Sequence, residues 1–418
     1  MNSRSVNVQT DFPRLYTSVA VFLLGGCSLI FPSGYSLGAV LLLLSGLGLL
    51  ITMRVPRLTK EDAWVVAAVV AYAAVALAEV WWDGQGSKGL DKPSRFILAI
   101  PALWWVLRFP PKLVFLWSGL AVGAIAAGTW AGWQKLFEEV GRAQGHTHVI
   151  QFGNLSMLLG VLCLAGLGWA AVQRHRRAWV CLLVLGAGAG IMGSLLSGSR
   201  GGWVGFPVVL WVLYRAYGRN CPHWLKTLTV CAVVVGGLTA YALPQAGVQD
   251  RVHQAVDEIG FYISDRESAT SVGARFEMWR GAALLIKEKP LFGWGGNGYR
   301  QGLTALGEQN IINDNVTQYS HAHNEFIDAF AKRGIIGLIV LLALYVIPMR
   351  LFFRSFEEPD LSKRSVAVAG ALLPVAYIDF GLTQAFLTHN SGVMMYAFLL
   401  AILWGTHSAY RHQKVALS

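Results

Sequence analysis

Two histidines stand one residue apart in a polar stretch, Ser320-His321-Ala322-His323-Asn324-Glu325, directly before an apolar helix. Histidine is the side chain that takes up or releases a proton near neutral pH. A proton-transferring group also needs a partner that orients it, and Asn324, Glu325 and Asp328 are near enough in sequence to do so. An ordinary capped helix N-terminus is the alternative, but a pair of histidines at this boundary favours proton-transfer chemistry.

Two arginines lie where they could contact an anion. Arg200 is in the glycine-rich turn Ser197–Trp203, whose backbone can bend sharply and approach a ligand. A guanidinium binds phosphate through paired hydrogen bonds, although an arginine at a helix end can also simply reach the membrane surface. Arg275 falls in a predicted loop helix, where an ion pair with Glu277 or Glu267 is the commoner role.

The elements that must position these residues are membrane helices. The 418 residues are 55% hydrophobic and 14% charged, and the mean hydropathy of +0.49 is too high for a soluble domain. A helix of roughly 20 apolar residues crosses a bilayer with its backbone hydrogen bonds satisfied internally. We expect about 12 transmembrane helices, at residues 15–31, 35–53, 63–81, 95–108, 113–133, 149–172, 178–197, 202–217, 225–243, 334–353, 365–382 and 390–410.

The distribution of Lys and Arg predicts the orientation. With the N-terminus in the cytoplasm, the cytoplasmic segments and their flanking helix ends hold more than half of the 34 basic residues. Both termini are then cytoplasmic. Residues 244–333 form one large periplasmic loop between the ninth and tenth helices, inserted within a single integral membrane domain of residues 1–418.

The large loop is expected to be partly helical. Ser271 can cap a helix that runs to Lys289, where Pro290 stops it, and Leu291–Tyr299 is predicted to be a tight glycine turn. The apolar face that carries Trp279 and Trp294 suggests either a loop on the membrane surface or a small packed cap.

No metal or cofactor is expected. Asp265-Arg266-Glu267 is the one acidic pair at one-residue spacing in an outside loop, and Arg266 between the acids favours solvated charge over a metal site. The five cysteines lie in or beside the predicted spans, without the spacing of a disulfide framework or a zinc site. Arginine is therefore the expected means of neutralising a bound pyrophosphate.

Three motifs together resemble the bacterial lipopolysaccharide O-antigen ligase and polymerase family. His323-Asn324 followed by Gly334-Ile335-Ile336-Gly337 resembles the signature of that family, and Ser197–Gly201 resembles its arginine turn. Gly273-Ala274-Arg275, with Trp279, Pro290 and the glycine turn, resembles its long-loop segment. The motifs span residues 197–337, and the predicted layout resembles the GT-C type of multispan, lipid-dependent glycosyltransferase.

The resemblance implies an inverting, metal-independent glycosyltransferase of the cell inner membrane, active in lipopolysaccharide biosynthesis. It would transfer O-antigen polysaccharide from undecaprenyl pyrophosphate to a terminal sugar of lipid A-core on the periplasmic face. No nucleic-acid partner would be expected. His323 would be the general base, and Arg200 and Arg275 would stabilise the pyrophosphate. Weaker candidates for orienting the base or binding substrate are Arg280, His321, Asn324, Glu325, Lys88 and Arg95.

Two other functions stay open. An O-antigen polymerase or a protein O-oligosaccharyltransferase would use the same donor, and the sequence does not identify the acceptor. A transporter of lipid-linked glycans belongs to a different class, but it more often has broken helices and charges at the membrane midplane. The charges of this chain gather instead at the large loop.

Overall fold

The described part of the chain is helical throughout. The computed structural model describes residues 8–242, 248–264 and 270–415, and no strand occurs among them. The α-helices are α1 (Val8–Gly26), α2 (Tyr35–Ile51), α3 (Lys60–Trp82), α4 (Ser87–Arg108), α5 (Leu113–Leu136), α6 (Val149–Ala165), α7 (Leu167–Ala171), α8 (Arg176–Ser197), α9 (Phe206–Tyr217), α10 (His223–Ala242), α11 (Val248–Ile263), α12 (Ser271–Glu288), α13 (Gly295–Glu308), α14 (Glu325–Phe353), α15 (Leu361–Gly381) and α16 (Asn390–Val415).

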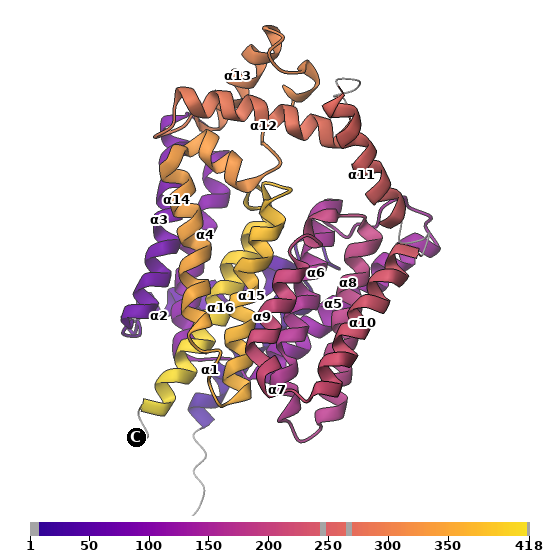
Figure 1. The fold of residues 1–418 in the computed structure, drawn as a ribbon. Coiled ribbons are helices and arrows are strands. Elements are labelled where there is room, and N and C mark those ends of the chain that lie inside the picture. Colours follow the sequence, from indigo (N-terminus) through magenta and orange to yellow (C-terminus); the bar gives the residue numbers. More distant parts are fainter. Residues whose placement is uncertain (1–7, 243–247, 265–269, 416–418) are drawn as a thin grey trace, which may run out of the picture.

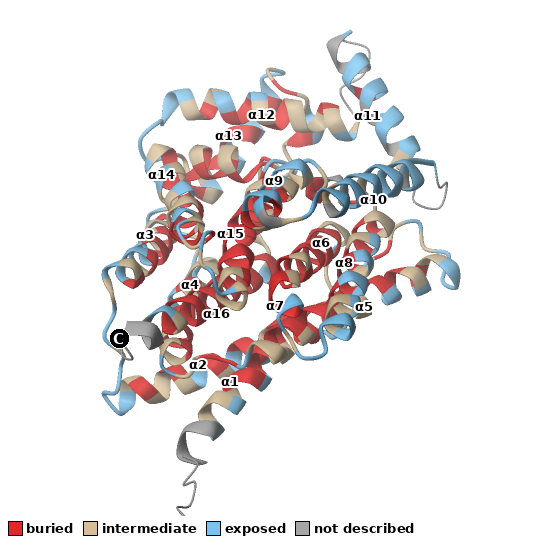
Figure 2. Ribbon diagram, turned by 60° about the horizontal axis from the view of Figure 1, so that its bottom comes forward, coloured by how far each residue is buried: buried red, intermediate tan, exposed pale blue. Residues whose placement is uncertain are grey.

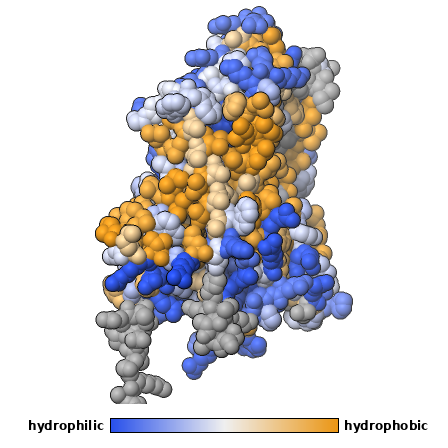
Figure 3. All heavy atoms as spheres, turned by 90° about the vertical axis from the view of Figure 1, so that its left-hand side faces the viewer, coloured by the Kyte–Doolittle hydropathy of each residue, from blue (hydrophilic) through white to orange (hydrophobic). Residues whose placement is uncertain are grey.

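The composition of these helices makes the chain a multi-pass membrane protein. Among the described residues, seven helical segments are long and apolar enough to cross a bilayer: α3, α5, α6 with α7, α8, α14, α15 and α16. Each of the twelve predicted spans overlaps a helix, but five of these helices are not among the seven. α2, α9 and α10 are short apolar helices, and α1 and α4 also fall outside this group. A broad hydrophobic belt separates two hydrophilic ends of the molecule (Figure 3), as a bilayer requires.

The bundle is organised around its last helices. The apolar stretch of α16 is buried along its whole length, and those of α6 and α15 are mostly buried, whereas α10 and α11 are largely exposed (Figure 2). Glycine allows other pairs of helices to approach closely. A Cβ at Gly128 of α5 would lie 2.3 Å from the Ala189 carbonyl oxygen of α8, so these two helices meet backbone to backbone.

The large loop forms a packed cap over one end of the bundle. Figure 1 shows α12 lying across this end, with α13 beyond it and α11 leading up from α10. The cap has its own hydrophobic core, to which α12 contributes Met278 and Leu285 and α13 contributes Tyr299 and Leu303. The structure corrects one detail of the prediction, because Thr270, not Ser271, caps α12 by accepting from the Gly273 N–H at 3.1 Å.

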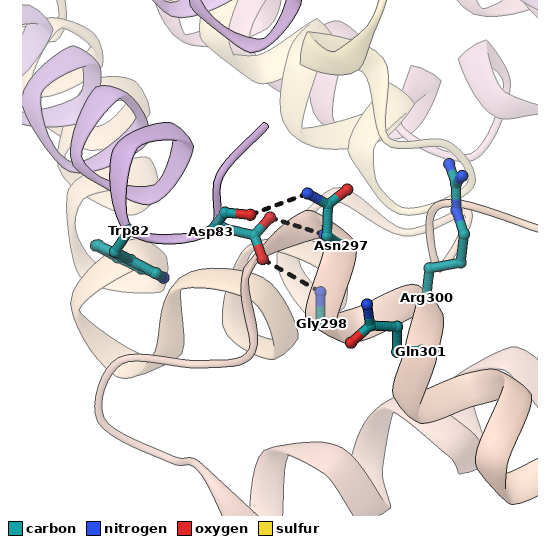
Figure 4. Close-up of a pocket in the computed structure, with 6 residues that line it drawn as sticks. All are labelled: Trp82, Asp83, Asn297, Gly298, Arg300 and Gln301. Carbon is teal, nitrogen blue, oxygen red and sulfur yellow. Dashed lines mark hydrogen bonds between the residues drawn. The ribbon is translucent and has the colours of Figure 1, made fainter. Parts of the chain in front are cut away.

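The predicted glycine turn is shorter than expected, because α13 begins at Gly295. An acidic side chain from a distant loop stabilises this glycine-rich helix start. The Asp83 carboxylate accepts from the Asn297 N–H at 2.7 Å and from the Gly298 N–H at 3.2 Å (Figure 4). The Asn297 amide donates in return to the Asp83 carbonyl oxygen at 2.9 Å. Local sequence could not reveal this partner, which follows α3.

A kink in α14 holds the cap. Gly334 has φ +63° and ψ −165° inside this helix, which begins at Glu325, nine residues before the predicted span. The Ile335 N–H donates to the Pro290 carbonyl oxygen at 2.8 Å, and the Trp294 N–H donates to the Ala331 carbonyl oxygen at 3.0 Å. The segment between α12 and α13 is therefore bonded directly to the backbone of the kink.

Candidate functional site

The site is built on a short segment, residues 320–324, which we call the His strap. Ala322 at its centre is fully buried, its N–H donates to Asp328 at 3.1 Å, and its carbonyl accepts from the Trp279 indole at 2.8 Å. Lys332 donates to the Ser320 carbonyl at 2.8 Å and forms a buried ion pair with Asp328 at 2.9 Å. α12 and α14 thus fix the backbone of the strap from two directions.

Both histidines of the strap project to the same place. The ring centroids of His321 and His323 lie 4.4 Å apart, and Tyr319 packs edge-on against His323 at 5.6 Å. His323 has φ +48°, a left-handed conformation that costs energy for a residue with a side chain. Within the described part of the chain, His321 Nε2 and His323 Nδ1 are buried without a hydrogen-bond partner. These nitrogens retain hydrogen-bonding capacity, and the Gln384 side chain is a polar group that acts on both rings.

Burial keeps these histidines neutral. Desolvation, with the neighbouring charge of His321 and Arg275, lowers the pKa of His323 from 6.5 to about 4. Desolvation also lowers the pKa of His321, against the opposing charge of Asp328. A neutral imidazole has a lone pair that can accept a proton, but a pKa near 4 makes His323 a weak base until a bound anion raises that pKa.

Two residues that the sequence interpretation missed complete the cluster. His389, just before α16, has its ring centroid 6.1 Å from that of His321, and its Nε2 lies 3.1 Å from Nε2 of the buried Gln384. The Gln384 side chain also favours the protonated forms of His321 and His323. The adjacent pair His389-Asn390 in a short loop resembles His323-Asn324 in composition, and this likeness is the one signal that could have pointed to it.

The structure describes the side chain of only one of the two predicted arginines. Arg275 is half-buried on α12, and its charge acts on His323. Arg200 begins the short 3₁₀ turn Arg200–Gly202, and its side chain lies outside the described part of the structure. The turn itself lies near the strap. A Cβ at Gly201 would fall 2.3 Å from Thr383 Oγ1, and the neighbouring Leu382 carbonyl accepts from the Asn324 amide at 3.2 Å.

Asn324 and Glu325 hold the surrounding backbone. The Asn324 carboxamide oxygen accepts from the Phe326 and Ile327 N–H groups, each at 3.0 Å, and so caps α14. The buried Glu325 carboxylate accepts from the Leu387 N–H at 2.8 Å. These contacts join the start of α14 to the loop that carries Gln384 and His389, and they give both residues a supporting role in the site.

The remaining candidates have no recorded contact with His321 or His323 among the described residues. Arg280 is exposed and pairs with Glu277 at 3.8 Å. Arg95 pairs with Asp91 at 2.8 Å and donates to the Asn390 carbonyl at 3.3 Å, which places it beside the loop of His389. Lys88 is exposed in the first turn of α4.

No cluster of three or more His, Cys, Asp or Glu side chains suited to a metal ion occurs in the described ranges. Asp265, Arg266 and Glu267, which the sequence interpretation assigned to solvated charge, lie outside those ranges. Among the surface cavities that the described residues form, two involve elements of the site and the cap. One, of about 430 Å³, lies beside Asp83 and Arg300 (Figure 4), and the other, of about 320 Å³, is lined in part by His389.

The fold and the site define a helical, multi-pass membrane protein with a histidine cluster under a packed cap at one end of the bundle. Residues 185–342 match the model of the O-Antigen ligase family. This range contains the arginine turn, α12 and the His strap, and it bears out the resemblance seen in the three motifs. The match supports the assignment of the chain to the O-antigen ligase family.

The chain is also similar over most of its length to a bacterial protein. An uncharacterized protein of Haemophilus influenzae is 29% identical over 376 residues, which cover 88% of this chain and 92% of the relative. The similarity therefore extends beyond residues 185–342 on both sides of the family match.

Proposed function

We propose that the protein transfers O-antigen polysaccharide from undecaprenyl pyrophosphate to a terminal sugar of lipid A-core, on the periplasmic face of the inner membrane. The observation that carries the proposal is the strap itself. The half-buried, neutral imidazoles of His321 and His323 lie side by side within the family domain, and the charge of Arg275 acts on His323. Neutral imidazole suits proton abstraction from a sugar hydroxyl, and arginine suits pyrophosphate.

In the proposed reaction, the acceptor hydroxyl oxygen attacks the anomeric carbon of the donor from the face opposite to the pyrophosphate. The bond between that carbon and the pyrophosphate oxygen breaks, and its electron pair stays on the pyrophosphate. His323 takes the hydroxyl proton. Arg275 and Arg200 offset the charge that grows on the leaving group, which is most effective in a partly dehydrated site. One in-line displacement inverts the anomeric centre and requires no metal in this scheme.

The test is transfer by the purified full-length protein in liposomes, with chelator present. The donor is undecaprenyl-pyrophosphate-linked glycan and the acceptor is lipid A-core. We expect wild-type transfer to survive the chelator and His323→Ala to reduce kcat roughly 10²–10⁴-fold, the usual effect of losing a general base. His175→Ala, an exposed histidine before α8, is the control and should retain activity.

Other outcomes would select another function. Full activity of His323→Ala would remove His323 from the chemistry, and loss of wild-type transfer with chelator would indicate a metal. Absence of transfer to lipid A-core, with transfer to glycan repeats or to a protein acceptor, would identify a polymerase or a protein O-oligosaccharyltransferase. Movement of the donor across the bilayer, without transfer of its glycan to any acceptor, would identify a transporter.

A further inference from the structure

The smaller cavity lies directly behind the histidine cluster. Its volume of about 320 Å³ falls within the range of small-ligand sites, roughly 300–1,000 Å³. His389 belongs both to its wall and to the cluster, since its ring lies 6.1 Å from that of His321. A ligand in the cavity would therefore lie one imidazole away from the His strap.

The cavity is assembled from four parts of the chain. Tyr35 comes from the start of α2, Lys92 from α4, His146 and His148 from the segment before α6, and Gln151 from the first turn of α6. Residues 388–391 close it. The lining is polar and presents hydroxyl, imidazole, amide and ammonium groups.

Gln151 is the observation that points to a ligand. Its side chain is 1% exposed and lines the cavity. Within the described part of the chain, neither its amide nitrogen nor its carbonyl oxygen has a hydrogen-bond partner. Leaving such a buried group unpaired costs free energy. A ligand that both donates and accepts hydrogen bonds, as a sugar hydroxyl does, would satisfy both atoms.

The charged groups near the cavity restrict the chemical class of ligand further. Lys92 places an ammonium group in the wall, and its charge acts on His389 together with that of His148. Arg275, in contrast, acts on His323. Cationic groups thus lie on two sides of the cluster. Arg275 acts on His323 of the strap, and Lys92 lies behind His389 together with Arg95, which is paired with Asp91.

We propose that this cavity binds a sugar of the acceptor glycan that carries an anionic substituent, with Gln151 bonding its hydroxyls and Lys92 its anion. The inference rests on the proposed function. In the proposed reaction, His323 must face the attacking hydroxyl of the acceptor. An acceptor sugar bound in the cavity, one imidazole ring away from the strap, can place the adjacent sugar of the same glycan next to His323. The donor pyrophosphate carries more than one negative charge and matches the arginine side of the cluster better than a wall with a single lysine.

The first experiment measures KM for each substrate separately, using the full-length protein in liposomes. Gln151→Leu and Lys92→Ala should raise KM for lipid A-core roughly 5- to 100-fold, the range expected for losing buried or charged hydrogen bonds. KM for the donor and kcat should change by less than about threefold. Gln173→Leu and Lys287→Ala, which replace the same residue types away from the cavity, should leave all three constants unchanged.

A rise in KM for the donor, with KM for the acceptor unchanged, would assign the cavity to the donor and overturn the proposal. Unchanged KM for both substrates would overturn it as well. If Gln151→Leu fails to fold, Lys92→Ala alone decides, because Lys92 is only partly buried.

A binding measurement separates this inference from the proposed function. Titration calorimetry of the detergent-solubilised protein with delipidated core oligosaccharide, phosphorylated or enzymatically dephosphorylated, requires no transfer. We expect the wild type to prefer the phosphorylated form and Lys92→Ala to lose that preference. If the wild type shows this binding preference but no transfer to lipid A-core, the binding site is supported and the ligase function is rejected. If transfer occurs and is unchanged by substitution of Lys92 or Gln151, the binding site alone is rejected.

Discussion

At the residue scale, the central feature is a histidine, the proposed base, that is kept neutral by desolvation and by nearby cations. His323 is held beside His321 by a strap whose backbone is anchored to Trp279 and Asp328. The sequence revealed this pair because both histidines lie in one short segment. It did not reveal Gln384 and His389, which arrive two helices later and join the cluster only through the packing of α15 and α16.

The lowered pKa of His323 predicts the pH dependence of transfer. Because its pKa is about 4 rather than 6.5, the base stays neutral down to about pH 5 in the free protein. We expect kcat/KM to be flat from pH 7 to about 5 and to fall near pH 4. Bound pyrophosphate is negative and raises the pKa of His323 in the enzyme–substrate complex. The acid limb of kcat, which reports that complex, should therefore lie at higher pH than that of kcat/KM.

The measurement is a pair of pH–rate profiles, with full recovery of activity at pH 7 as the control for unfolding. The same burial also makes the folded state less stable in acid. A histidine whose pKa is lowered by folding contributes stability that is present above 6.5 and is lost as the pH falls towards 4. An acid limb of kcat/KM near 6.5 would contradict a desolvated His323 as the base.

At the scale of elements, backbone contacts between distant segments position the site. The helix Ser271–Glu288 was predicted almost to the residue, because Pro290 and the apolar periodicity are local signals. The start of α13 was predicted as a turn, because glycine-rich sequence is typical of turns and Asp83, which stabilises it, lies in another loop. Where local propensity is weak, tertiary contacts of this kind determine the secondary structure.

Gly334 gives a prediction at this scale. A Cβ there would lie 2.1 Å from the Leu291 carbonyl oxygen, and φ is +63°. Backbone strain alone costs about 1–3 kcal/mol, so Gly334→Ala should lower the thermal midpoint in detergent and reduce transfer. Gly132→Ala, at a helical position with no neighbour within 4 Å of the added Cβ, is the matched control. Equal midpoints for the two variants would show that the kink does not hold the cap.

At the scale of the whole molecule, the predicted orientation awaits a test. Membrane class and helix positions could be predicted from hydropathy, whereas the side of the cap rests on the distribution of Lys and Arg. With the five native cysteines replaced by alanine, Arg300→Cys on α13 and Arg219→Cys after α9 provide one exposed probe at each end.

In right-side-out membrane vesicles, a membrane-impermeant maleimide should label Arg300→Cys at once. Arg219→Cys should react only after permeabilisation, because the prediction places residues 218–224 in the cytoplasm. The reverse pattern would invert the topology and place the His strap on the cytoplasmic side, which a periplasmic transferase cannot accommodate.

The order of the site's parts along the chain has a consequence for biosynthesis. The cavity wall from α2, α4 and α6 is made early, the strap follows before α14, and Gln384 and His389 emerge between the last two helices. The ribosome therefore delivers the closing residues only after most of the bundle has entered the bilayer, and α16 must then thread into its centre. A nascent chain arrested before residue 384 would carry His321 and His323 without Gln384 and His389, so competence for transfer should appear abruptly and late in translation.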